Sequence, residues 1–140
     1  MLKINVITPF PDMFDSIINT SILLKGKQKK IVEYNIVNLF KFLTDSSQRI
    51  DDYPFGGGKG MVLKPEPLSK AINELKDKKC NQRIIFPTPD GKLFDHNQAK
   101  KFSECDSLVF VCGHYKGIDQ RIRDNYITDE VSIGDYVLTS

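Results

Sequence analysis

LVFVCGHYKGIDQRIRDNYITDEVSIGDYVLTS, residues Leu108–Ser140, is the stretch that decides the fold of this chain. It begins with an unbroken apolar run, Leu108–Cys112, whose shortness and Val and Phe content are typical of a strand buried on both faces. Gly113 ends that run, and Gly117 opens a segment whose isoleucines have helical spacing. The order strand, glycine turn, helix places backbone N–H groups where they can hold a ligand.

A second glycine turn, Ser132–Tyr136, follows between two more short apolar segments. Because two turns that can hold a ligand lie so close together in the sequence, we expect one pocket to be built from both. Phe86–Asp90 is a third candidate wall, since it also lies at the end of a predicted strand.

Short apolar segments alternate with helical patterns along the rest of the chain. Strands are predicted at Leu2–Thr8, Ile31–Phe40 and Arg83–Phe86, helices after Pro11, over Pro65–Lys78 and after Asp95, and a turn at Pro87–Gly91. This alternation predicts an α/β fold with a mainly parallel sheet and helices on both faces. Ligands bind such sheets beyond the carboxyl ends of the strands, where Phe86–Asp90, Gly113–Gly117 and Ser132–Leu138 are all expected.

Length and composition restrict the class of protein. At 140 residues, with 40% hydrophobic and 27% charged residues, the chain is predicted to be a single soluble globular domain. Its N-terminal residues show no signal-peptide pattern. It also contains no apolar run of the about 20 residues that span a membrane, so we expect no membrane partner. Cys80, Cys105, Cys112, His96 and His114 form no zinc pattern, so we expect reduced thiols, a cytoplasmic location and no metal site.

Ser46–Gly60 is the longest irregular stretch and is rich in glycine. It is not a P-loop, because Gly60 stands where Ser or Thr is needed and Tyr53 stands where Gly is needed. It is not a dinucleotide-binding loop either, because Met61 replaces the last glycine. Two interpretations remain, a flexible linker or a substrate loop whose glycines let the backbone approach a ligand closely. Its charged and aromatic residues favour the substrate loop.

The net charge of +2 neither demands nor excludes a nucleic-acid partner. Two lysine clusters, Lys25–Lys30 and Lys76–Lys79, are more informative. Each is either solvated surface or a contact to a phosphate backbone, and such a contact would be independent of base sequence and weakened by salt.

Five segments closely resemble signature segments of one family, the bacterial tRNA (guanine-N1)-methyltransferases of the SPOUT superfamily. They are ITPFPDMF (7–14), RIDDYPFGGGKGMVL (49–63), FPTPDGKLFDH (86–96), CGHYKGIDQR (112–121) and DEVSIGDYVLT (129–139). The matches are collinear and extend over nearly the whole chain. The resemblance implies a C-terminal trefoil knot around S-adenosylmethionine, a tRNA substrate and a homodimer. It also implies the target, N1 of the guanosine immediately 3′ of the anticodon.

The resemblance further assigns residues to the expected pocket. The apolar side chains of the last wall would contact the adenine ring, although Ile133–Leu138 has a core strand as its alternative interpretation. The implied cofactor-binding residues are Thr88, Pro89, Gly113, Tyr115, Gly117, Ser132, Ile133, Gly134, Asp135, Tyr136, Val137 and Leu138. The implied substrate-binding residues are Arg49, Asp52, Gly57 and Gly58. The expected cofactor is S-adenosylmethionine, with Mg²⁺ as a second candidate.

Methyl transfer to guanine N1 requires removal of the proton on that nitrogen, and a positioned carboxylate is the usual device. In the resembling family the base is an aspartate, assisted by an arginine, located C-terminal to the region matched here. We therefore predict no catalytic residue within residues 1–140, which we interpret as a SPOUT cofactor-binding domain without the family's C-terminal tRNA-binding domain. Spacing nominates no substitute among the other acidic residues, Asp51, Asp52, Asp119, Asp129, Glu130 and Asp135.

Two other functions fit the same residues. A non-catalytic or truncated RNA-binding domain would keep the fold without methylating, and a SPOUT methyltransferase could act on another RNA. The chain also departs from the family at two positions. Lys116 stands where many relatives carry Glu, which reverses a charge beside the methionine end of the cofactor, and His114 stands where Arg is frequent.

A homodimer is also expected from apolar residues near the predicted pocket. Tyr115, Ile118, Tyr126 and Tyr136 present more apolar surface than a small lone domain easily covers, and Phe55 has no obvious helix to lie under. The alternative is that these residues fill the core of their own chain.

Overall fold

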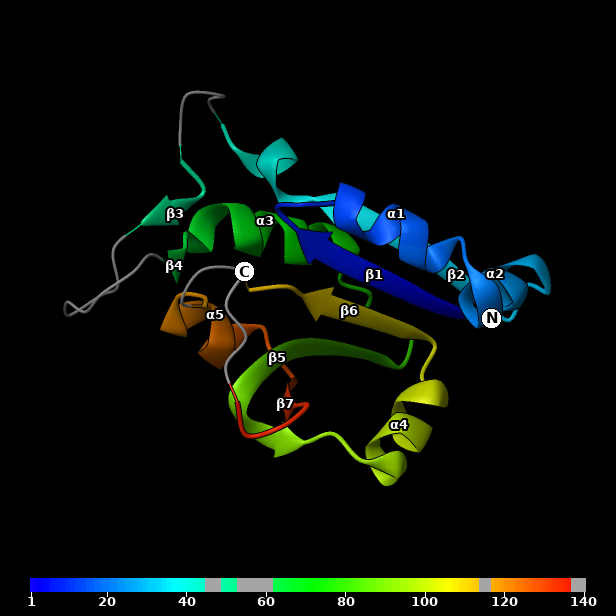
Figure 1. Ribbon diagram of the computed structural model, residues 1–140. Coiled ribbons are helices and arrows are strands. Elements are labelled where there is room, and N and C mark those ends of the chain that lie inside the picture. The colour runs from blue at the N-terminus through cyan, green and yellow to red at the C-terminus, as the bar shows by residue number, and fades with distance from the viewer. Residues whose placement is uncertain (45–48, 53–61, 114–116, 137–140) are drawn as a thin grey trace.

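The computed structural model describes residues 1–44, 49–52, 62–113 and 117–136 (Figure 1). Its centre is a five-stranded sheet in which every pair of neighbouring strands is parallel, in the order β2-β1-β6-β5-β7. The strands are β1 (Leu2–Thr8), β2 (Val32–Asn38), β5 (Gln82–Leu93), β6 (Ser107–Val111) and β7 (Asp129–Ser132). The predicted α/β fold with a mainly parallel sheet is confirmed.

Helices connect the strands of this sheet. They are α1 (Asp12–Ile18), α2 (Ser21–Gln28), α3 (Pro65–Leu75), α4 (His96–Ser103) and α5 (Gln120–Asn125), with a 3-10 helix, η1, at Leu39–Phe42. Two short strands, β3 (Asp51–Asp52) and β4 (Val62–Leu63), form a separate antiparallel pair.

Each face of the sheet buries its own set of side chains, because successive residues of a strand point to opposite faces. Along β6, Val109 and Val111 belong to the larger core, which α3 and α5 cover with Leu68, Ile72 and Ile122 among others. Leu108 belongs instead to the smaller core, which contains Phe102 of α4. Figure 1 shows α3 and α4 on opposite sides of β6. The prediction of helices on both faces is therefore confirmed.

Local side-chain contacts set where several elements begin and end. Asp95 caps α4 as predicted, since its Oδ1 accepts a hydrogen bond from Gln98 N at 2.8 Å. Asp119 caps α5, so this helix begins at Gln120 rather than directly after Gly117. β2 ends at Asn38 instead of continuing to Phe40, because the Asn38 side chain accepts from Phe40 N and starts η1. α3 ends at Leu75, short of the predicted Lys78.

The prediction of a turn at Pro87–Gly91 was wrong, because β5 continues to Leu93. Pro87 and Lys92 both pair with Val131 of β7, so the four residues between them leave the ladder as a bulge. β5 pairs with β6 only over Gln82–Ile85, and the prolines therefore lie where no N–H is needed on that side.

The predicted helix after Pro11 is confirmed as α1, which stops at Ile18 before α2 starts at Ser21. No residue of α1 is fully buried, since Phe14 and Ile18 are half-buried and Ile17 is 55% exposed. Part of its apolar face thus remains uncovered by the rest of the described chain. The expected knot stays a prediction, since residues 114–116 and 137–140 lie outside the described residues.

Candidate functional site

Two of the three predicted walls lie just beyond strand ends at one edge of the sheet, whereas Phe86–Asp90 does not lie at a strand end as predicted, because β5 continues to Leu93. Gly113 follows β6, the bulge Thr88–Gly91 belongs to β5, and Ser132–Tyr136 follows β7, and these are neighbouring parallel strands. Carboxyl ends of parallel strands share one edge, which is where α/β sheets bind ligands. Tyr115, Val137 and Leu138, with Lys116 and His114, lie outside the described residues.

Gly113 and Gly117 lie close to the ring of Phe86. A Cβ built on Gly113 would be 2.8 Å from Phe86 Cε1, and one on Gly117 would be 3.9 Å from Phe86 Cζ. Phe86 itself is only 4% exposed and belongs to the larger core. The backbone at these two glycines is therefore backed by a buried aromatic ring.

The turn Ser132–Tyr136 is closed by its own side chains. The buried Ser132 hydroxyl donates to Gly134 O at 2.8 Å and accepts from Gly134 N at 3.1 Å. Gly134 has a φ of +156°, and a Cβ there would overlap the ring of Tyr136. Ile133 and Tyr136 are 66% and 51% exposed, so their apolar surfaces are available to a ligand. Ser132 holds the turn together, whereas Ile133 and Tyr136 face outward.

The β5 bulge packs directly on the backbone of β7. A Cβ on Gly91 would lie 2.7 Å from Glu130 C and Val131 N, so only glycine fits at this approach. Thr88 donates a hydrogen bond to Asp90 Oδ1. The pKa of the Asp90 carboxyl is lowered, first by this bond and then by a bond from Arg123.

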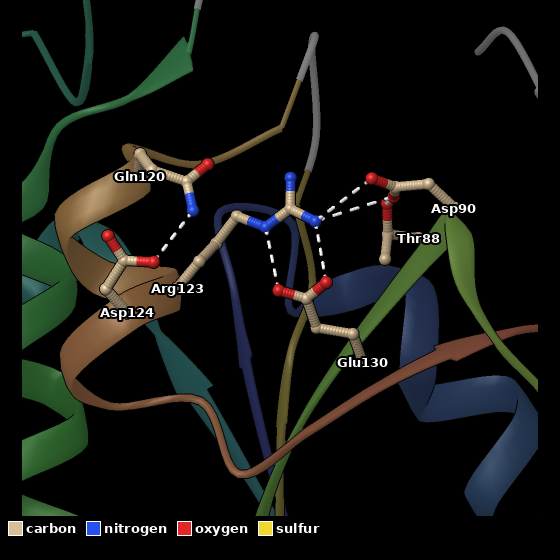
Figure 2. Close-up of polar contacts among 6 residues, drawn as sticks. All are labelled: Thr88, Asp90, Gln120, Arg123, Asp124 and Glu130. Carbon is tan, nitrogen blue, oxygen red and sulfur yellow. Dashed lines mark hydrogen bonds and ion pairs between the residues drawn. The ribbon is translucent and has the colours of Figure 1, made fainter.

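Arg123 of α5 joins the bulge to β7, as Figure 2 shows. Its Nε donates to Glu130 Oε1 at 2.9 Å and its Nη2 donates to Glu130 Oε2 at 2.7 Å. The same Nη2 lies 3.2 Å from Asp90 Oδ2, and the guanidinium carbon lies 5.4 Å from the centroid of the Phe86 ring. The pKa of Arg123 is raised, chiefly by the bond to Glu130. Arg123 was not among the site residues predicted from the sequence.

The strand that follows the predicted substrate loop, β4, contacts Gly117 and Ile118. Leu63 N of β4 donates to Gly117 O at 3.0 Å, and Leu63 forms a bridge with Ile118. Arg49 forms a two-pronged pair with Asp51, at 3.0 and 3.3 Å. Asp52 pairs through its backbone with Val62. Gly57 and Gly58 lie outside the described residues.

Most acidic residues near the site are engaged by arginine. Asp119 caps α5 and pairs with Arg121, which lowers the pKa of its carboxyl. Burial raises the pKa of Asp129, but hydrogen bonds from Arg83 and Thr128 outweigh it, so the pKa is lowered. A lowered pKa makes a carboxylate a weaker base. The described part of the chain therefore nominates no general base among these side chains.

The described residues contain neither a metal-binding cluster nor a membrane-spanning helix. Within residues 1–44, 49–52, 62–113 and 117–136, no group of three or more His, Cys, Asp or Glu side chains could hold a metal ion. A role for Mg²⁺ thus stays a prediction. Among the same residues, no helix has the length and apolar character to cross a membrane.

Comparison with known proteins gives a match over almost the entire chain. A family model described as tRNA (Guanine-1)-methyltransferase TrmD matches residues 2–140. A tRNA (guanine-N(1)-)-methyltransferase of Staphylococcus carnosus is 47% identical over 138 residues, covering 99% of this chain and 56% of that protein. One of Bacillus cereus strain AH820 is 45% identical over 139 residues, covering 99% of this chain and 57% of that protein. The chain spans a little over half the length of these curated relatives.

Proposed function

Because this chain belongs to the tRNA (Guanine-1)-methyltransferase TrmD family, we propose that residues 1–140 form the S-adenosylmethionine-binding domain of a tRNA (guanine-N1)-methyltransferase. The proposed target is N1 of the guanosine immediately 3′ of the anticodon, and the proposed location is the cytoplasm. The observation that carries the proposal is that two glycine turns follow the carboxyl ends of β6 and β7, with the bulge of the neighbouring strand β5 packed against β7.

The residues at this edge fit an adenosine-containing ligand. Ile133 and Tyr136 offer exposed apolar surface to a flat ring, and the backbone of their turn offers donors and acceptors to the ring edge. A ligand can approach the backbone directly at Gly113 and Gly117, because neither residue has a side chain. When bound, S-adenosylmethionine supplies an electrophilic methyl group. These residues bind the cofactor and orient it toward the substrate.

The strand β4, which follows the predicted substrate loop, supports the proposal of a tRNA base beside the cofactor. The bond from Leu63 N of β4 to Gly117 O ties this strand to the last residue of the Gly113–Gly117 wall. A guanine held by the loop close to β4 would be near that wall, which provides the alignment that methyl transfer needs. The lysine cluster Lys25–Lys30 offers exposed positive charge to the phosphate backbone at a distance from the pocket.

The proton on guanine N1 needs an acceptor that these residues do not identify. Asp90, Asp119, Asp129 and Glu130 each pair with an arginine. By resemblance the base is an aspartate C-terminal to the matched region, so we expect residues 1–140 alone to bind cofactor without turnover. The same pairing favours a second candidate, a non-catalytic RNA-binding domain that keeps the cofactor pocket.

A homodimer is proposed on different residues from those first expected. Ile118 is buried and Tyr126 packs on the larger core, so these two fill the core of their own chain. Exposed apolar side chains remain at Tyr136 and on the first two helices, among them Ile17 and Ile22. Apolar surface of this kind commonly marks an interface. Sedimentation equilibrium of residues 1–140 tests the proposal, and a monomer mass at all micromolar concentrations would contradict it.

A chimera tests the proposed activity. Residues 1–140 replace the matched segment of the Staphylococcus carnosus relative, and radiolabelled methyl transfer to unmodified tRNA transcripts is measured. We expect transfer to a transcript with guanosine 3′ of the anticodon and none when that base is adenosine. A folded chimera that binds the cofactor but methylates neither transcript would favour the non-catalytic candidate.

A further inference from the structure

We propose that Arg123 is the positioning residue that holds all three walls of the cofactor pocket in place, an inference that rests on the proposed function. Arg123 contacts the β5 wall directly and the other two walls indirectly. It bonds Asp90 of the β5 bulge and Glu130 of β7, which precedes the Ser132–Tyr136 turn, and it lies over Phe86, whose ring is close to Gly113 and Gly117. Figure 2 shows its guanidinium between the two carboxylates.

Arg123 provides a positive charge between two neighbouring carboxylates. Asp90 and Glu130 both accept hydrogen bonds from the same Nη2 atom, at 3.2 and 2.7 Å. Without a cation between them, two carboxylates that close would repel each other and favour separation of the bulge from β7. Arg123 thus converts a repulsion between two walls into attraction to a shared partner.

The planar guanidinium of Arg123 also has the shape needed to contact both carboxylates. The guanidinium donates two hydrogen bonds to Glu130, from Nε and Nη2. The same Nη2 also donates a hydrogen bond to Asp90. A planar fork with several fixed donors can do this, whereas a lysine ammonium is a single point charge. The Arg123 side chain is 20% exposed, so water screens these contacts only in part. The orientation of one side chain therefore fixes the spacing of two strands.

Phe86 links Arg123 to the glycine turn. The guanidinium lies 5.4 Å from the Phe86 ring centroid, a distance at which a cation is attracted to an aromatic face. The same ring is close to Gly113, where an added Cβ would be 2.8 Å from Cε1. A rotation of Phe86 would therefore disturb the backbone at Gly113, so Arg123 also restrains a wall that it does not bond.

Arg123→Met is the test, with Arg121→Met as the matched control. Arg121 is on the same helix, but it pairs only with Asp119 among the described residues and its side chain is 70% exposed. Calorimetry measures affinity for S-adenosylhomocysteine at a temperature where urea titration shows each variant fully folded. We expect affinity to fall about tenfold or more for Arg123→Met, and to change less than about twofold for Arg121→Met.

A second readout separates positioning from general stability. In Arg123→Met without ligand, the backbone amide resonances of Gly113 and Gly134 should shift, whereas that of Gly26 in α2 should not. Arg123→Lys keeps the charge but not the fork, so it should restore the urea midpoint more fully than the affinity. Recovery of both in equal measure would indicate a merely structural role and overturn the inference.

The remaining outcomes distinguish this inference from the proposed function. Wild-type protein that binds no S-adenosylhomocysteine while folded would overturn the proposed function, and the inference with it. Wild-type binding that Arg123→Met leaves unchanged would overturn the inference alone. Glu130→Gln and Asp90→Asn should each weaken binding less than Arg123→Met does, because each removes one wall's contact and leaves the others.

Discussion

Gly134→Val perturbs the candidate site at its most constrained glycine. Gly134 has a φ of +156°, a backbone conformation that residues with a Cβ rarely adopt. Strained backbone conformations of this kind cost about 1 to 3 kcal/mol. A Cβ at this position would also overlap the ring of Tyr136, so the valine side chain displaces that ring.

Both effects act on the surface that we assign to the adenine. Tyr136 is 51% exposed, with its ring resting on Gly134, and Ser132 bonds both the N–H and the carbonyl of Gly134. Valine therefore either strains the turn or breaks the Ser132 contacts to relieve the strain. We expect affinity for S-adenosylhomocysteine to fall at least about tenfold, which corresponds to about 1.4 kcal/mol.

Isothermal titration calorimetry of residues 1–140 measures this loss directly. Gly26→Ala serves as the control, because Gly26 lies in α2, where an added Cβ meets only the Val32 side chain. That variant should bind with wild-type affinity. If Gly134→Val binds as tightly as wild type while urea titration confirms that it is folded, the Ser132–Tyr136 turn does not hold the cofactor.

Three further predictions concern packing, pH and thiol chemistry. Gly91→Ala should lower the free energy of unfolding by about 1 to 3 kcal/mol in urea titration, because its Cβ meets the β7 backbone at 2.7 Å. An unchanged midpoint would contradict the close approach. The lowered pKa values of the Asp119 and Asp129 carboxyls mean that their contribution to stability is present above an ordinary carboxyl pKa of about 4 and is lost as pH falls through the lowered values. Arg83→Met should reduce this acid sensitivity, and an identical pH dependence in both proteins would count against the Arg83–Asp129 pair. Burial raises the pKa of the Cys112 thiol to about 11. In a variant that keeps only this cysteine, reaction with a disulfide reagent at pH 8 should be roughly a hundredfold slower in the folded than in the urea-unfolded protein, and equal rates would refute its burial.

The sheet and the two glycine turns could be predicted from the sequence because their signals are local. Leu108–Cys112 is apolar without interruption because β6 is buried on both faces, with Val109 in the larger core and Leu108 in the smaller one. Gly113 and Gly134 marked the turns because few other residues fit there. Such positions depend on the strand and turn to which they belong, whereas the assignment of a cofactor to these turns stays a prediction.

Other features depend on contacts between distant segments, and the sequence did not reveal them. Pro87 and Pro89 suggested a turn, but the pairing of β5 with β7 keeps both in a strand with a bulge. Arg123 looked like one charged residue among several, because its partners Asp90 and Glu130 are brought to it only by the fold. The spacing of apolar residues in α1 indicates an apolar face, yet amphipathic spacing does not say what covers a helix, and no residue of α1 is fully buried.

The central claim is that residues 1–140 bind S-adenosylmethionine at the carboxyl edge of β5, β6 and β7. It is tested most directly by following backbone amide resonances of the wild-type protein during titration with S-adenosylhomocysteine. We predict saturable shifts at Gly113 and Gly117 of the first glycine turn and at Gly134 of the second, with Gly26 unaffected. Folded protein whose amides do not shift, or shift only at residues remote from this edge, would contradict the account.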